Sequence, residues 1–359
     1  MTVLLFVVGL VCLIAGAETL VRGASRLAAM FGIPPIVIGL TVVAFGTSSP
    51  ELAVSIKSSL SGQAGVALGN VVGSNIFNVL FILGISAIII PLTVDRQLLR
   101  LDVPVMVVMS IVVLLLSLDQ ALSRADGLLL VTVLFSYIGF LIYQSRKNHA
   151  QLAAEMPEAQ TVPAAGNAGW LMNLVLIVIG LALLVAGSRW LVDSAVAFAQ
   201  YLGVSELVIG LTIIAAGTSL PEVVTSIIAA VRGERDIAVG NVIGSNIFNI
   251  LGVLGFAGIV APGGIPVPAS VVGFDFPVMI AVALACLPVF FSGGVIDRKE
   301  GVLFLGYYVI YTLYLILNTS GHDALPLFNG VMLYFVIPFT VLVLVNITLQ
   351  ETRKRKRQE

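Results

Sequence analysis

The stretch "GLTVVAFGTSSPE" at 39–51 places hydroxyls, a proline and a glutamate at the end of an apolar run. Thr47 and Glu51 are four residues apart, so their side-chain oxygens share one face of a helix. Pro50 lacks a backbone donor and clashes with the preceding turn, which frees nearby carbonyls, notably around Ala44. In apolar surroundings such a break must be buried in protein or line a hydrated cavity, where carbonyl oxygens can coordinate a cation.

A second polar stretch, "GNVVGSNIFNVL" at 69–80, follows a short distance along the chain. Ser74 and Asn78 are again four residues apart, so a hydroxyl and an amide oxygen project from one helical face. Together with the first stretch they supply carboxylate, hydroxyl, amide and backbone oxygens, with no paired cysteine or histidine. Such a ligand set suits hard cations such as Ca²⁺ and Na⁺.

Both stretches recur 171 residues later, as "GLTIIAAGTSLPE" at 210–222 and "GNVIGSNIFNIL" at 240–251. The offset drifts by only two or three further on, where "LDVPVM" at 101–106 answers "FDFPVM" at 274–279. Each copy therefore covers a whole half of the chain. The second copy supplies the matching residues Ala215, Thr218, Pro221, Glu222, Ser245 and Asn249.

The composition is that of a polytopic helical membrane protein. Of 359 residues, 59% are hydrophobic and only 10% are charged, and the mean hydropathy is +1.10. A soluble fold would lack the polar surface needed to cover so much apolar material. Repeated apolar runs of about eighteen residues or more are each long enough to cross a bilayer. We therefore expect an all-α membrane fold in which the broken helices lie at the centre.

Each copy contains five apolar segments. In the first copy they are 3–29, 36–60, 66–90, 103–119 and 127–145, and in the second 170–197, 207–230, 237–260, 276–292 and 301–318. An odd number per copy makes the second copy enter the membrane from the opposite side, which predicts a 5+5 inverted repeat, a transporter architecture. The predicted organisation is a first repeat at 1–145, a linker at 146–169, a second repeat at 170–319, an additional helix at 326–349 and a basic tail at 350–359.

The positive charges predict an orientation, because cytoplasmic loops are enriched in lysine and arginine. If the N-terminus lies outside, most of these residues fall at cytoplasmic ends, and the linker, the C-terminus and the tail "RKRKR" at 353–357 are cytoplasmic. The simplest role for that tail is to anchor the topology at anionic headgroups of the lipid bilayer, although a lipid-binding or regulatory patch is an alternative.

Two further pairs of matched asparagines accompany the motifs. For Asn70 and Asn241, packing or capping and contact with ions both stay open. For Asn75 and Asn246, support of the ion ligands and a purely structural role stay equally open. Asp102 and Asp275 precede matched prolines, so we expect them to cap helices.

Alignment at the same offset also exchanges charge signs between two matched pairs. Glu18 corresponds to Arg189, and Arg22 corresponds to Asp193. Each pair has a spacing of four and can form an ion pair within its own helix. The alternative is that Glu18 pairs with Arg189 across the axis relating the two copies in one access state.

The duplicated patterns "GTS-x-PE" and "GN-x-x-GSNIFN" resemble the cation/Ca²⁺ exchanger superfamily, specifically its prokaryotic Na⁺/Ca²⁺ exchanger branch. The resemblance implies one central Ca²⁺ site flanked by Na⁺ sites, with Glu51 and Glu222 as the principal Ca²⁺ carboxylates. It implies alternating access in which the first and sixth helices slide past the other eight. The remaining implied ligands are Thr47, Ser48, Thr218, Ser219, Ser74, Ser245, Asn78 and Asn249, with the carbonyls of Ala44 and Ala215. Some members of the superfamily carry an aspartate where this chain has Asn249, so only two carboxylates are expected here.

The predicted function is a secondary antiporter that exchanges Na⁺ for Ca²⁺ across a bacterial or archaeal cell membrane. An exchanger of H⁺, in place of Na⁺, for Ca²⁺ or another divalent cation would share the architecture, and protons are expected to compete for the glutamates. A cation channel is less favoured, because two enclosing half-sites suit occlusion better than rapid passage. The sequence contains no catalytic motif of an enzyme, and we expect neither a cofactor nor a nucleic-acid partner. It does not determine an oligomeric state.

Overall fold

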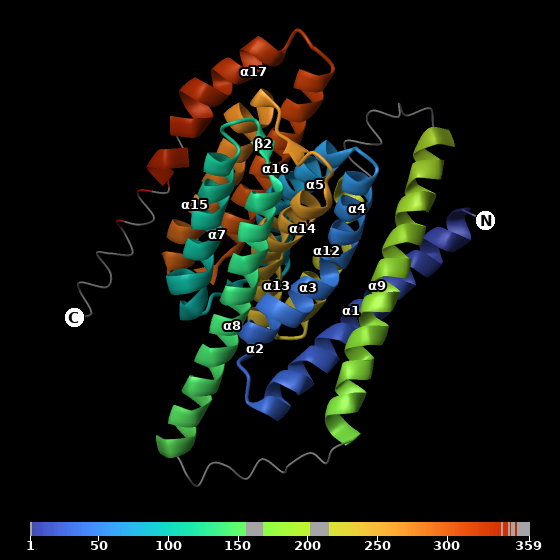
Figure 1. The fold of residues 1–359 in the computed structure, drawn as a ribbon, viewed down its shortest axis with the longest axis vertical. Coiled ribbons are helices and arrows are strands. Elements are labelled where there is room, and N and C mark those ends of the chain that lie inside the picture. The colour runs from blue at the N-terminus through green and yellow to red at the C-terminus, as the bar shows by residue number, and fades with distance from the viewer. Residues whose placement is uncertain are drawn as a thin grey trace.

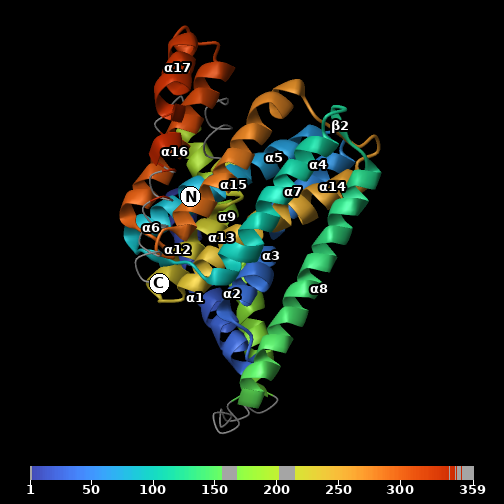
Figure 2. The ribbon, with the colours of Figure 1, turned by 90° about the vertical axis from the view of Figure 1, so that its left-hand side faces the viewer.

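The computed structural model describes residues 2–155, 168–201, 215–338, 340–343, 345 and 349, and they form a bundle of helices (Figures 1 and 2). Within those residues, eight helices are long and apolar enough to cross a membrane. The count is nine if the bent pair Pro35–Thr47 and Ser49–Leu60 is one span. The apolar runs form helices because hydrocarbon surroundings require every backbone polar group to be bonded within its own segment.

The elements of each half follow one pattern. In the first half they are α1 (Thr2–Phe31), α2 (Pro35–Ile38), η1 (Gly39–Val43), α3 (Ala44–Thr47), α4 (Ser49–Leu60), α5 (Ala64–Phe77), η2 (Asn78–Leu83), α6 (Gly84–Ile89), β1 (Leu92–Thr93), η3 (Leu98–Asp102), α7 (Val103–Leu116), β2 (Ala121–Leu122) and α8 (Arg124–Glu155). In the rest they are α9 (Ala168–Tyr201), α11 (Ala215–Gly217), α12 (Leu220–Val231), α13 (Arg235–Phe248), η6 (Asn249–Val253), α14 (Leu254–Val260), β3 (Ile265–Pro266), η7 (Val271–Asp275), α15 (Phe276–Phe291), β4 (Val295–Ile296), α16 (Arg298–Thr319), α17 (Leu325–Val331) and η8 (Met332–Val336).

Three predicted segments differ from the structure or lie partly outside it. Helix α8 continues to Glu155, so the first ten residues of the predicted linker are helical, as expected for the sequence RKNHAQLAAE, which consists mostly of good helix formers. The rest of the linker before α9 lies outside the described residues. The predicted spans at 207–230 and 326–349 are described only in part, so the total of eleven spans stays a prediction, as does the basic tail.

Helices α1 and α9 pack against each other along one side of the bundle (Figure 1). A methyl group built on Gly9 would lie 2.9 Å from the carbonyl oxygen of Gly187, and one on Gly16 would lie 2.8 Å from that of Gly180. Such a close approach requires residues without a side chain. Gly180 and Gly187 match Gly9 and Gly16 in the sequence repeat, so the two contacts exchange with each other under the axis that relates the halves.

Two short antiparallel strand pairs also join the two halves, and the axis that relates the halves exchanges one pair with the other. Strand β1 pairs with β4, with Leu92 opposite Ile296, and β2 pairs with β3, with Leu122 opposite Ile265. In each ladder a loop of one half bonds to the neighbouring loop of the other half. The halves are therefore interlocked rather than placed side by side as separate domains.

The two motif-bearing helices occupy the core. In the continuous span from Arg235 to Val260, 89% of the most apolar window is buried, compared with 28% for α1 and 11% for α16. Helix α13 also lies against η1, where a methyl group on Gly244 would meet the backbone of Leu40 at 2.7 Å. The polar motifs thus lie where the protein, rather than lipid, surrounds them.

Candidate ion-binding site

Both motif helices are interrupted at a serine three residues before their glutamate. In the first repeat α3 ends at Thr47, Ser48 leaves the helical conformation with φ −82° and ψ 7°, and α4 starts at Ser49. The two segments are bent by 45°. The second repeat has the same interruption at Ser219, with φ −88° and ψ 7°, before α12. A proline follows in the first turn, where its missing N–H costs no helical hydrogen bond.

The expectation of a free carbonyl at Ala44 is wrong. This oxygen accepts the backbone N–H of Ser48 at 3.0 Å and the hydroxyl of Thr47 at 3.3 Å. The reason is positional, because Pro50 removes the donor that would reach Gly46, four residues earlier, and not the donor for Ala44. A ligand role for the Ala44 carbonyl stays a prediction. Ala215 opens α11, and its role is likewise untested.

Each glutamate accepts a hydrogen bond from a serine of the opposite repeat. The hydroxyl of Ser48 donates to Oε1 of Glu222 at 2.8 Å, and the hydroxyl of Ser219 donates to Oε1 of Glu51 at 3.0 Å. The hydroxyls of Ser219 and Ser74 lie 3.3 Å apart, within hydrogen-bonding distance. The two half-sites thus meet at one place in the core.

The threonines repeat this exchange between the halves. The side chain of Thr218 hydrogen-bonds to Glu51, and that of Thr47 hydrogen-bonds to Glu222. Thr218 is half-buried, whereas Thr47 and both glutamates are buried. Each carboxylate therefore has two hydroxyl groups of the other repeat beside it.

Five buried oxygen atoms of the predicted ligands have no hydrogen-bond partner among the described residues. They are Oε2 of Glu51, Oε2 of Glu222, Oδ1 of Asn78, Oδ1 of Asn249 and Oγ of Ser245. Buried polar atoms are rarely left unpaired, because the loss of water is then uncompensated. Such unpaired oxygens, contributed by both repeats, are available to a bound cation.

The amides of this set lie at irregular points of their helices. Asn78 begins the π-helical segment η2, and Asn249 begins the matching segment η6. Single π-turns within α-helices are frequent at functional sites, because the wider turn redirects side chains. Ser74 and Ser245 lie one turn earlier on α5 and α13, and both are buried.

Asn70 and Asn241 connect the helices on either side of each half-site. Asn70 donates to the carbonyl oxygen of Glu51 at 3.3 Å and to the hydroxyl of Ser55 at 3.0 Å. Asn241 does the same with Glu222 at 3.4 Å and Ser226 at 2.9 Å. These contacts favour the packing interpretation of the two asparagines, since their nitrogens hold the backbone of the glutamates in place.

The sequence reasoning did not single out Ser55 and Ser226. Both are buried acceptors for those asparagines. Two signals were present, because each serine follows its glutamate by four residues and the two serines lie 171 positions apart. The same rule that selected Thr47 would have selected them.

Asp102 and Asp275 do not cap helices as predicted. Neither carboxylate makes a capping hydrogen bond, because η3 and η7 run directly into α7 and α15 and leave no exposed first turn. Instead, the hydroxyl of Tyr137 donates to Asp102 at 2.7 Å, and the hydroxyl of Tyr311 donates to Asp275 at 3.4 Å. They join neighbouring helices outside the half-sites.

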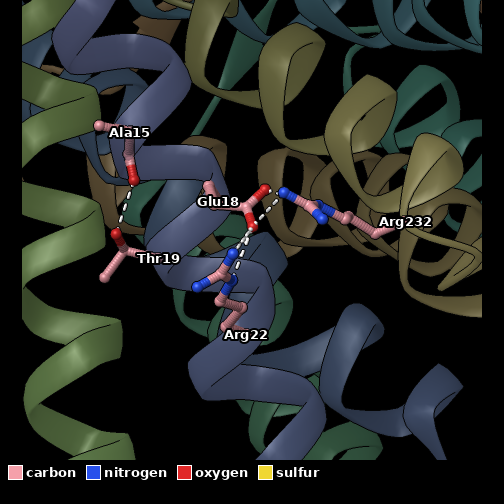
Figure 3. Close-up of polar contacts among 5 residues, drawn as sticks. All are labelled: Ala15, Glu18, Thr19, Arg22 and Arg232. Carbon is pink, nitrogen blue, oxygen red and sulfur yellow. Dashed lines mark hydrogen bonds and ion pairs between the residues drawn. The ribbon is translucent and has the colours of Figure 1, made fainter.

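The charge-exchanged pairs also differ from one another. Glu18 forms the predicted ion pair with Arg22 within α1 at 2.6 Å, and a second one with Arg232 at 2.6 Å (Figure 3). The alternative pairing of Glu18 with Arg189 is not formed. Arg189 lines a pocket of about 450 Å³ beside the break between α3 and α4. Within the described part of the chain, Arg189 and Asp193 do not form an ion pair.

The described residues hold no group of three or more histidine, cysteine, aspartate or glutamate side chains placed to hold a metal ion together. Any cation at the half-sites would be held by two carboxylates and neutral oxygens. A ligand set in which only two groups are charged suits an ion that must leave again. Broken helices that meet at the centre of an inverted repeat define the class of secondary transporters.

Comparison with known proteins identifies the family. The sequence model of the sodium/calcium exchanger protein family matches residues 1–144 and 172–317, so the chain belongs to this family. It is a multi-pass membrane protein and a cation/Ca²⁺ exchanger by family, not an enzyme.

Several relatives match over most of their length. A protein named putative antiporter CaxA from Alkalimonas amylolytica is 40% identical over 85% of this chain and 95% of its own. The sodium/calcium exchanger MaX1 from Methanosarcina acetivorans is 34% identical over 87% and 97%. A structure of the sodium-calcium exchanger NCX_Mj is 32% identical, with a TM-score of 0.75 over 88% of this chain and 98% of that one. This match confirms the predicted all-α inverted-repeat fold.

Proposed function

We propose that this protein exchanges Na⁺ for Ca²⁺ by alternating access, and that both ions bind between Glu51 and Glu222. The observation that carries this proposal is the set of five unpartnered buried oxygens on residues of both repeats. They comprise carboxylate, amide and hydroxyl oxygens, the ligands that Ca²⁺ and Na⁺ accept. Because each repeat supplies about half of them, relative movement of the repeats would open and close the site.

Charge balance supports exchange rather than joint transport. Two carboxylates neutralise one Ca²⁺, so simultaneous binding of Ca²⁺ and several Na⁺ would leave excess positive charge in a region of low dielectric constant. Ca²⁺ and Na⁺ must therefore compete. Competition for one site, with only one kind of ion bound at a time, couples the movements of the two ions in opposite directions.

The names of the relatives favour Na⁺ as the driving ion, since MaX1 and NCX_Mj are both called sodium/calcium exchangers. One feature favours H⁺ as a second candidate. The amide of Asn249 leaves the site with two acids, and two protons would cancel their charge as fully as one Ca²⁺ does. We assign H⁺ the part of a competitor and Na⁺ that of the exchanged ion.

Ion flux into proteoliposomes tests this proposal. We expect ⁴⁵Ca²⁺ uptake when Na⁺ is loaded inside and diluted outside, and little uptake when a K⁺ or H⁺ gradient replaces it. Uptake driven only by the H⁺ gradient would establish the second candidate. Flux that neither saturates nor shows counterflow would indicate a channel instead.

We further propose that the N-terminus lies outside the cell membrane and the C-terminus lies inside, as the distribution of Lys and Arg favours. Arg22 and Arg232 would then lie near the cytoplasmic side, and Lys57 near the outer side. In a background with both native cysteines replaced by alanine, single cysteines at the exposed positions Ser61 and Arg96, at opposite ends of the span between them, would separate the two orientations by their labelling in intact cells. Labelling of position 96 but not of position 61 by an impermeant reagent would reverse the assignment.

A further inference from the structure

Asn75 and Asn246 meet at the boundary between the two repeats. The side-chain nitrogen of Asn75 donates to the backbone oxygen of Asn246 at 3.4 Å, and that of Asn246 donates to the backbone oxygen of Asn75 at 3.2 Å. A backbone oxygen can only accept, so each contact determines which end of the amide is the nitrogen. The sulfur atoms of Met279 and Met106 lie 3.7 and 3.5 Å from these nitrogens and complete the pattern.

The orientation is passed on to two predicted ion ligands. With its nitrogen occupied, Asn75 presents Oδ1 to the side-chain nitrogen of Asn249 at 3.2 Å. Asn246 likewise presents Oδ1 to the side-chain nitrogen of Asn78 at 3.0 Å. The nitrogens of Asn78 and Asn249 are thereby bonded to asparagines of the opposite repeat. Their Oδ1 atoms are the ones left without a partner.

We propose that Asn75 and Asn246 are positioning residues that orient the ligand amide of the opposite repeat with its oxygen toward the ion. This inference rests on the proposed function and assigns a role within the same site. If the side-chain amide of Asn78 or Asn249 rotated by about 180°, it would present its NH₂ group to the cation, and the site would lose one oxygen ligand. Each repeat therefore controls a ligand of the other.

A packing role for these asparagines makes a different prediction. Packing depends on volume and affects neighbours on the same helix, whereas orientation couples Asn75 to Asn249 and Asn246 to Asn78. Asn75 and Asn78 share one continuous helical segment but no side-chain hydrogen bond in the structure. This pair is therefore the matched control for the pair Asn75 and Asn249.

A double-mutant cycle on Ca²⁺ and Na⁺ affinity tests the assignment. The variant Asn75→Leu removes the hydrogen bonds at similar volume, and we expect it to weaken ion binding by about 10- to 100-fold, as is usual when the group supporting a ligand is lost. Added to Asn249→Ala, it should have little further effect, because that ligand is already absent. Added to Asn78→Ala, it should retain its full effect.

The assignment would be overturned if Asn75→Leu lowered ion affinity by the same factor in the Asn249→Ala background as in the Asn78→Ala background. Any folding defect of Asn75→Leu is common to both double variants, so the comparison between them stays valid. Affinities should be measured by equilibrium ⁴⁵Ca²⁺ binding in detergent and its displacement by Na⁺, as well as by flux. Absence of Na⁺-driven flux in the unmodified protein would contradict the proposed function. Normal flux with additive cycles would contradict only the role of Asn75.

A contact between α1 and the turn after α12 carries a second, independent inference. Glu18 forms an ion pair with Arg232 at 2.6 Å, and the hydroxyl of Ser25 donates to Glu234 at 2.5 Å. Figure 3 shows the carboxylate of Glu18 between the guanidinium groups of Arg22 and Arg232. Helix α1 is thus joined to the core by charged and polar groups at this one turn.

The repeat-related contact cannot form an ion pair. At the offset of 171, Glu18 becomes Arg189 and Arg232 becomes Ser61. Arg189 lies instead in the pocket beside the helix break, together with Gly46 and Ser49. Inverted repeats exchange conformations when a transporter changes its access side. The pocket would then form beside α1, which requires Glu18 and Arg232 to separate.

We propose that the pair of Glu18 and Arg232 is a latch that favours the conformation with the pocket beside Arg189 over the exchanged conformation with a pocket beside α1. It rests on the proposed alternating access but is tested without flux. In a background with both native cysteines replaced by alanine, Ala186→Cys places a thiol in the pocket for labelling by an impermeant maleimide. We expect Glu18→Gln and Arg232→Gln to slow labelling by about two- to fivefold, the effect of losing a partly exposed ion pair.

The matched control is Arg22→Gln, which removes the pair within α1 but leaves the pair between helices. It should leave the labelling rate near that of the parent. Equal effects of Arg22→Gln and Arg232→Gln would overturn the latch, as would unchanged labelling in Glu18→Gln.

Discussion

The hydroxyl of Ser48 lies 2.8 Å from Oε1 of Glu222, although the two residues are 174 positions apart in the chain. Ser219 and Glu51 form the corresponding contact in the opposite sense. Neither repeat therefore contains a complete set of contacts for its own glutamate. Any change that moves one repeat relative to the other alters both carboxylates at once.

Neutralising either glutamate should abolish transport without unfolding the protein. We expect Glu51→Gln and Glu222→Gln to lose Na⁺-dependent Ca²⁺ uptake in vesicles, because a single remaining carboxylate cannot balance Ca²⁺. The glutamine oxygen can still accept the serine hydroxyl, so the fold should persist. Asp193→Asn on the exposed face of α9 is the control and should transport normally. Uptake at the original rate in Glu51→Gln would contradict the ion site.

Removal of the Ser48 hydroxyl should weaken Ca²⁺ binding, whereas removal of the neighbouring Ser49 hydroxyl should not. Ser48→Ala takes a donor from Glu222, and a hydrogen bond to a charged group contributes about 1.5–3 kcal/mol. We therefore expect Ca²⁺ affinity to fall roughly tenfold or more, as measured by equilibrium binding. The adjacent Ser49 donates to the backbone of Phe45, and Ser49→Ala should bind Ca²⁺ almost as before. Similar losses in both variants would show that the effect is not specific to Glu222.

Transport should fall as the pH is lowered. A carboxylate must be deprotonated to hold a cation, so ion binding releases protons and the affinity decreases as the proton concentration rises. For the same reason, raising the Ca²⁺ concentration should move the midpoint of inhibition to lower pH. The measurement is initial ⁴⁵Ca²⁺ uptake between about pH 5 and 8. A flat profile, or a midpoint that does not move with Ca²⁺, would contradict competition at the glutamates.

The contact between Tyr137 and Asp102 should contribute to stability. Tyr137→Phe leaves a buried carboxylate without its 2.7 Å donor, and an unsatisfied buried group costs about 1–3 kcal/mol. We expect a lower midpoint of thermal unfolding in detergent. Tyr311→Phe is the matched control, because its hydroxyl lies 3.4 Å from a less buried Asp275. A larger decrease in the unfolding midpoint for Tyr311→Phe than for Tyr137→Phe would contradict this prediction.

The glycine contacts between α1 and α9 should tolerate no added methyl group. Gly16→Ala would place a carbon 2.8 Å from the Gly180 oxygen, and overpacking of this kind costs about 1–3 kcal/mol. Gly139→Ala, on an exposed face of α8 with no described atom within 4 Å, should be neutral or stabilising by up to about 1 kcal/mol. Thermal unfolding of both variants distinguishes the two cases. Equal unfolding midpoints for the two variants would mean that the contact between α1 and α9 accommodates a methyl group without loss of stability.

Much of the fold follows from the sequence because its signals are local and are present twice. Apolar runs determine spans, and an odd number of spans in each copy determines the inversion. Spacing of four residues singled out Thr47 and Glu51, but the helix is interrupted between them at Ser48, and each contacts the opposite repeat instead of sharing one helical face. Motif matching alone, however, does not state which residue of one copy faces which residue of the other, since a helix can rotate and shift against its neighbours.

Those relationships are decided by the packed structure. Periodicity did not show that Asp102 accepts a hydrogen bond from Tyr137, that Glu18 pairs with Arg232, or that Asn249 donates to Asn75. Each depends on the register of helices far apart in sequence, which is established by close contacts such as Gly16 against Gly180. By itself, the sequence determined the residue types, their spacing and the twofold repetition. Only the tertiary structure decided the partners and the direction of each amide, because hydrogen bonds and ion pairs depend on distances of a few ångströms between separate helices.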